Sequence, residues 1–82
     1  MREEVRRFAE LMEAKLKRND WKGGWKNDSS AWLFGRLLEE TCELYQVLFA
    51  GETKERIASE AADVANFAMM LADPERLKAE EA

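Results

Sequence analysis

Two long helical patterns joined by only three residues constrain the fold of this chain more than any other feature. Apolar side chains recur at helical spacing from about Ser30 to Ala50, and again from about Thr53 to Ala72. The connection begins with Gly51, and glycine is the residue that most often ends a helix. Helices joined by so short a connection run antiparallel, side by side. The sequence therefore predicts a helical hairpin at the centre of the fold.

The remaining segments predict two further helices and one loop. Residues 2–18 carry apolar side chains at helical spacing, whereas residues 19–28 are rich in glycine and in polar turn formers. Asp73 followed by Pro74 is typical of a helix start, which predicts a short fourth helix. We find no strand pattern. With 82 residues the chain has room for one domain, and we predict a single all-α domain over residues 1–82.

The apolar surface of the predicted hairpin is too wide for a chain of this length to cover. The second predicted helix is apolar over roughly half of its circumference, and the third carries a similar arc that is rich in alanine. Only one other long helix is available to cover both arcs. We therefore expect copies of the chain to assemble, as a homodimer or a homotetramer, into an oligomeric four-helix-type bundle. We also expect Trp21, Trp32 and Cys42 to be buried.

Composition excludes several classes of function. The chain has no histidine and one cysteine, which excludes histidine-based zinc sites, Ser-His-Asp catalysis and Cys-His catalysis. A formal net charge of -4 argues against a nucleic acid polymer as partner, because phosphate contacts need a basic surface. No apolar run approaches the roughly 18 residues of a membrane span, and the N-terminus is too charged for a signal peptide. We expect a cytoplasmic protein with no membrane partner.

Pairs of acidic residues lie beside both apolar arcs of the hairpin. Glu40 and Glu43 lie roughly 60° apart on the second predicted helix, and Glu60 and Asp63 do so on the third. Because the apolar arcs must face each other, the two pairs can converge on one side of the hairpin. A hard divalent cation would relieve the repulsion among four carboxylates. With no histidine or thiolate among the ligands, the pattern favours Mg²⁺ or Mn²⁺.

A solvated helix surface explains the same acids without a metal. Arg36 and Arg56 lie four residues before Glu40 and Glu60, so each arginine can form an ion pair across one turn or bind a phosphate. The alternative to an enzyme is therefore a non-catalytic helical dimerisation module whose acids are simply solvated.

Four other residues are candidates for substrate binding. Lys22, in the glycine-rich loop, can hold a phosphate, and Trp25 can stack on a base. Asn66 lies one turn beyond Asp63, where its amide could contact a sugar or a base, and Lys15 is a further candidate. Each residue also has an ordinary structural explanation, such as a solvated lysine or a tryptophan that closes one end of the bundle.

Taken together, the acids resemble the signature of a known family. Glu39, Glu40 and Glu43, followed after sixteen residues by Glu60 and Asp63, resemble the EExxE…ExxD signature of the MazG-like all-α nucleoside triphosphate pyrophosphohydrolases. A small single-domain branch of that group has a similar upstream segment, which here is Lys15-Leu16-x-x-Asn19-Asp20-x-Lys22-Gly23-Gly24-Trp25. The resemblance covers about residues 8–72 and includes Asp63-Val64-Ala65-Asn66-Phe67.

This resemblance implies an activity and roles for the acids. Family members hydrolyse a nucleoside triphosphate between the α and β phosphates in nucleotide-pool housecleaning, need Mg²⁺, and work as dimers or tetramers of helical bundles. The metal ligands implied by the resemblance are Glu40, Glu43, Glu60 and Asp63. Glu40 is then also catalytic together with Glu39, which either adds a ligand through water or orients the attacking water. The related phosphoribosyl-ATP pyrophosphohydrolases carry similar acids and remain an alternative.

Overall fold

A computed structural model describes residues 1–81, and within this range every regular element is a helix. The prediction of an all-α chain is confirmed, and so is the predicted order of the helices. The elements are α1 (Glu3–Arg18), a short 3₁₀ turn η1 (Asp20–Lys22), α2 (Ser30–Phe49), α3 (Lys54–Ala72) and α4 (Pro74–Glu81). None of the helices in this range is long and apolar enough to span a lipid bilayer.

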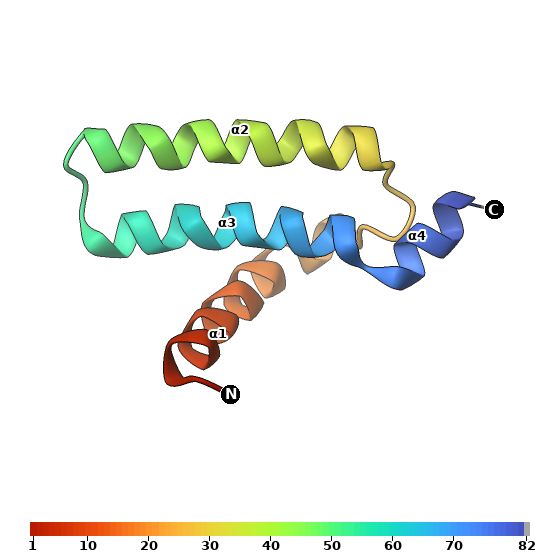
Figure 1. Ribbon diagram of the computed structural model, residues 1–82, viewed down its shortest axis with the longest axis horizontal. Helices are drawn as coiled ribbons and strands as arrows, with labels where there is room; N and C mark the ends of the chain where they lie inside the picture. The colour runs from red at the N-terminus through yellow and green to blue at the C-terminus, as the bar shows by residue number, and fades with distance from the viewer. Residues whose placement is uncertain (82) are drawn as a thin grey trace.

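The hairpin of α2 and α3 is fixed by the residues at its ends. Both helices begin with a side-chain cap, since the Ser29 hydroxyl accepts from the Trp32 N–H (3.1 Å) and the Thr53 hydroxyl from the Arg56 N–H (3.2 Å). Gly51 adopts a φ of 69°, the left-handed conformation that ends α2. The two helices lie antiparallel and side by side (Figure 1), as the three-residue connection predicts.

The first helix covers α3 and leaves α2 open on its outer side. The backbone of α1 packs against α3 and does not approach that of α2 (Figure 1). Large apolar side chains on α2 therefore remain about half exposed or more, and we call this surface the outer face of α2. Its members are Phe34, Leu38, Tyr45, Leu48 and Phe49.

Three residues that we expected to be buried are instead exposed. The exposed fraction is 79% for Trp21 and 54% for Trp32, and Cys42 is also exposed. Cys42 is exposed because no other described segment of the chain lies over the outer side of α2. Trp32 lies in the first turn of α2 on another side of the helix, where it lines a cavity and not a packed interface. Trp21 lies in the turn after α1, where the Lys22 ammonium is its neighbour, 5.4 Å from the ring centroid.

The interior of the described chain is small and unusually polar. The buried apolar residues are Leu33, Val47 and Ala62. Four charged or polar residues are equally well buried, namely Glu40, Glu60, Asn66 and Arg76. Burying a charged or polar group costs free energy unless the group is paired or hydrogen-bonded, so each of these four side chains needs a partner.

Candidate metal centre and adjacent cavity

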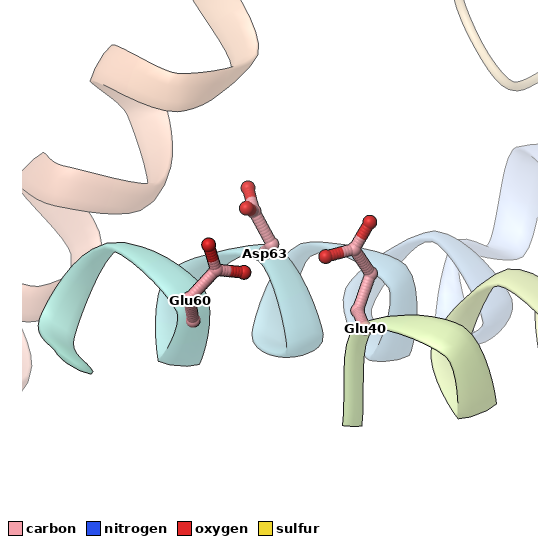
Figure 2. A group of neighbouring side chains, drawn as sticks. All are labelled: Glu40, Glu60 and Asp63. Atoms are coloured by element: carbon pink, nitrogen blue, oxygen red, sulfur yellow. The ribbon is translucent and has the colours of Figure 1, made fainter. Parts of the chain in front are cut away.

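Three carboxylates from the two hairpin helices meet at one place. Figure 2 shows Glu40 on α2 and Glu60 and Asp63 on α3, with their carboxyl groups on the same side of the hairpin. One oxygen from each group lies within 4.8 Å of the others. Glu40 and Glu60 are each only 7% exposed, and Asp63 is partly exposed. These distances would allow one small cation to contact all three groups.

The helical repeat explains why these three residues come together. Glu60 and Asp63 are three residues apart, so they lie on neighbouring positions of one helix surface. Glu40 occupies the facing position of the antiparallel partner helix, on the same buried side of α2 as Leu33 and Val47. The site is therefore held by rigid helices and not by loops.

Each carboxylate of this trio also has one basic partner. Arg36 Nη2 lies 3.0 Å from Glu40 Oε1, and Arg56 Nε lies 3.2 Å from Glu60 Oε1, so both ion pairs foreseen across one turn do form. The third partner comes from α1: Lys15 Nζ lies 3.2 Å from Asp63 Oδ2 and donates to the Ser59 hydroxyl at 2.8 Å. These bases offset the cost of bringing three acids together.

The two buried glutamates nevertheless keep one unsatisfied oxygen each. Glu40 Oε2 and Glu60 Oε2 are buried and have no hydrogen-bond partner. A buried acceptor without a partner costs about 1–3 kcal/mol, and more when it carries charge. Both glutamates thus use one oxygen for an arginine and leave the other free for a ligand that the protein itself does not supply.

The other two acids of the sequence pattern lie outside this trio. Glu43 is exposed, and it acts on the site through its effect on the pKa of Glu40. Glu39 is also exposed and forms an ion pair with Arg36. The structure therefore brings together three of the four expected ligands and places Glu39 beside the base that serves Glu40.

Burial of Glu40 changes its protonation. Loss of solvent raises the pKa of Glu40 from its ordinary value of 4.5 to about 7. The neighbouring carboxyl groups of Glu43 and Asp63 also raise the pKa of Glu40, whereas the charge of Arg36 lowers it. Glu40 can therefore exchange a proton near neutral pH.

A cavity of about 350 Å³ lies beside Asp63, at the end of the hairpin where the chain enters α2. All four residues that we singled out for substrate binding line it, namely Lys15, Lys22, Trp25 and Asn66. Its size is within the range of small-molecule sites, and its wall combines bases with aromatic rings. The cavity and the carboxylate trio share Asp63, so a ligand in the cavity would lie next to the acids.

These cavity residues differ in how firmly they are held. Asn66 is buried and donates to the Met12 carbonyl at 3.1 Å, while its own Oδ1 has no partner. The Trp25 indole donates to Asp73 Oδ2 at 2.8 Å, whereas Lys22 is exposed.

Sequence reasoning did not single out several other residues of the cavity wall. Asp28, Trp32 and Phe67 also line it. Arg36 lines it too, with its guanidinium 5.2 Å from the centre of the Phe67 ring, and its spacing to Glu40 already marks it as a partner for that acid or for a phosphate. Contacts between residues distant in sequence place the others, and no local pattern marks such contacts.

Comparison of the chain with protein-family models, with curated proteins and with solved structures finds no match. The geometry of the site and the resemblance of its motifs are therefore the only grounds for assigning a function.

The raised pKa of Glu40 predicts how stability depends on pH in the absence of divalent cations. Between its ordinary pKa of 4.5 and the folded value of about 7, the folded state holds a proton that the unfolded chain has lost. The free energy of unfolding should therefore fall as the pH rises from about 5 to about 8. Glu40→Gln should flatten this slope, as measured by urea unfolding at several pH values.

The control is Glu55→Gln, which changes an exposed glutamate of the same hairpin and should keep the slope of the wild type. The low pKa values of Asp73 and Glu80 do not interfere, because stabilisation by those groups is lost only at more acidic pH. An identical slope in Glu40→Gln and wild type would contradict the assignment.

Proposed function

We propose that the chain is a Mg²⁺-dependent nucleoside triphosphate pyrophosphohydrolase of the MazG-like type. It would convert a ribo- or deoxyribonucleoside triphosphate into the monophosphate and pyrophosphate. The observation that carries the proposal is the buried trio of Glu40, Glu60 and Asp63, with its two unsatisfied oxygens, beside a cavity lined by bases and aromatic rings. Housecleaning of the cytoplasmic nucleotide pool is the role that such an activity implies.

The donor set suits a hard divalent cation. All three groups offer carboxylate oxygen, which Mg²⁺ and Mn²⁺ prefer, and Mg²⁺ usually completes its shell with waters and substrate phosphates. Glu43 could supply a further oxygen, since it already contacts Glu40. When bound, the ion would neutralise charge on the phosphates and make water a better nucleophile.

The side chains of the cavity suit the rest of such a substrate. Lys15 and Arg36 each lie at both the acids and the cavity, so their charges can pair with phosphate oxygens, and Lys22 adds a third charge. Trp25 and Trp32 offer flat surfaces for a base. The unpartnered Oδ1 of Asn66 can accept a hydrogen bond from a sugar or base.

The reaction needs an acceptor for the proton of the attacking water. The oxygen of that water forms a bond to phosphorus while the bridging bond between the α and β phosphates breaks, and pyrophosphate leaves. A carboxylate of the site would accept this proton, because the chain has no histidine to do so. Glu39 would act on this step through Arg36, with which it forms an ion pair.

The alternative of a non-catalytic dimerisation module also has an observation in its favour. Each acid of the trio already has a basic partner, which is what a purely structural ion-pair network needs. The unsatisfied oxygens favour the metal, because a network selected for stability alone has no use for them. A further alternative is that the substrate is phosphoribosyl-ATP and not a nucleoside triphosphate. Assaying both compounds distinguishes the two.

The first prediction of this proposal concerns activity. With Mg²⁺, a panel of nucleoside triphosphates and phosphoribosyl-ATP should include a substrate that releases pyrophosphate and not orthophosphate. Glu40→Gln and Asp63→Asn should each lower kcat/KM by at least about 100-fold, the scale on which losing one electrostatic contact slows an enzyme. Glu55→Gln should match wild type. Near-normal turnover by Glu40→Gln would refute its assigned role.

The second prediction concerns metal binding without substrate. Mg²⁺ or Mn²⁺ at about 100-fold above its dissociation constant stabilises a protein by about 2.7 kcal/mol. In a domain of this size that corresponds to a rise in melting temperature of roughly 10 °C or more. Glu60→Gln should lose most of the rise while Glu55→Gln keeps it. Equal shifts in wild type and Glu60→Gln would place the ion elsewhere.

We also propose that the chain assembles as a homodimer or homotetramer through the outer face of α2. That face is apolar along most of the helix, and α1 does not cover it. Gly35 lies on the same helix, and a Cβ added there would meet no atom of another segment within 4 Å, so a second copy could approach closely. A two-fold interface would bury the same surface from each subunit.

The third prediction tests this assembly. Light scattering at micromolar concentration should show a dimer or tetramer for the wild-type chain. Phe34→Glu should shift it toward monomer, because a charge would enter the buried interface. The matched control is Val5→Glu, which has the same exposed fraction of 50% but lies on α1. An active wild-type monomer of 9.5 kDa would overturn the proposal.

A further inference from the structure

One wall of the cavity is a loop that has little internal structure. Gly23, Gly24, Trp25 and Asp28 form this wall between η1 and α2. Within residues 24–28, the backbone hydrogen bond from the Asp28 N–H to the Trp25 carbonyl (3.1 Å) closes a single turn. A Cβ added to either glycine would meet no atom within 4 Å, so close packing does not fix the backbone there. Contacts from elsewhere must hold the loop in place.

Those contacts come from the segment that begins at the end of α3. Asp73 Oδ2 accepts from the Trp25 indole at 2.8 Å and from the Lys26 ammonium at 2.6 Å. Further along α4, Glu80 accepts from the Ser30 N–H at 2.5 Å and from its hydroxyl at 2.6 Å. Both ends of the loop are thus tied to residues about fifty positions later in the chain.

Arg76 connects these two attachments through the interior. Its side chain is completely buried. Nη1 donates to the Asp28 carbonyl and Nη2 to the Ser30 hydroxyl, both at 3.0 Å. On its other side, Arg76 donates to the Met70 carbonyl at 2.9 Å and the Leu71 carbonyl at 3.0 Å, which belong to the last turn of α3.

Only a guanidinium can make this set of bonds. Its planar fork carries five N–H donors, whereas a lysine ammonium carries three on a single atom and cannot reach carbonyls on both sides at once. The Glu80 carboxylate, 3.5 Å away, balances the buried charge. Arg76 therefore joins the end of the α2–α3 hairpin directly to the wall of the cavity.

We infer that Arg76, with Asp73, is a positioning residue that holds the Trp25–Asp28 wall and thereby sets the affinity of the cavity for its ligand. That this ligand is a nucleoside triphosphate rests on the proposed function above. Arg76 contacts none of the three acids. Its loss should therefore weaken binding in the cavity but leave the metal site intact, whereas a merely structural arginine would affect both.

The test compares Arg76→Lys and Asp73→Asn with wild type, and Lys78→Gln, an exposed change on α4, is the control. In both variants KM for the best triphosphate of the panel should rise about 10-fold, kcat should stay within about twofold, and the Mg²⁺-induced thermal shift should be unchanged. The Trp25 indole N–H resonance should also move in Arg76→Lys, although Arg76 does not contact Trp25. Lys78→Gln should leave all four measurements as in wild type.

These measurements distinguish failure of this inference from failure of the proposed function. If no triphosphate is turned over, the proposed function fails, and the Trp25 resonance alone decides whether Arg76 positions the loop. An unmoved resonance, an unchanged KM, or a fall in kcat with loss of the Mg²⁺ shift in folded Arg76→Lys would overturn the inference. If Arg76→Lys does not fold, the same KM, kcat and Mg²⁺ criteria applied to Asp73→Asn decide.

Discussion

The structure depends on carboxylates buried between two antiparallel helices. Glu40 and Glu60 are held inside the hairpin, each with one oxygen against an arginine of the preceding turn and one oxygen without a partner. Burying acids in this way opposes folding, as the raised pKa of Glu40 shows. A hairpin selected only for stability would place apolar residues at these positions, since they pack as well without a desolvation cost. The arrangement is therefore best explained by a ligand that takes the free oxygens.

Periodicity predicts what lies within one helix or across one short turn. It predicted the hairpin and the convergence of Glu40, Glu60 and Asp63, because each follows from the helical repeat and the three-residue connection, but it also grouped the exposed Glu43 with them. Periodicity does not show which apolar side chains of a helix another segment will cover. Trp32 and Cys42 were therefore wrongly expected to be buried. Arg76 was missed for a related reason. Its partners lie up to 48 positions away, and nothing in a polar C-terminal segment distinguishes a buried arginine from a solvated one.

The small apolar interior gives the chain a physical reason to assemble. With only Leu33, Val47 and Ala62 as buried apolar residues in the described chain, one copy has little hydrophobic stabilisation of its own. The outer face of α2 is the obvious place to gain more, and oligomerisation is a usual remedy for a domain of this size. Trp32 lies on a different side of α2, in the wall of the cavity. A second copy packed on the outer face would therefore add apolar burial without covering Trp32.

The acids and the cavity loop are supported in different ways, and this division has a chemical consequence. The acids stand on the middle of two helices and need no residue outside the hairpin except Lys15. The loop has almost no structure of its own and is held by Asp73, Arg76 and Glu80. In the proposed enzyme, metal binding and turnover would require fixed geometry, which helices provide. Ligand entry and release would require a wall that can yield, and a few hydrogen bonds from a short helix can break and re-form at far lower cost than a packed core. The fold thus carries the acids on two packed helices and the cavity wall on a loop that a few hydrogen bonds hold.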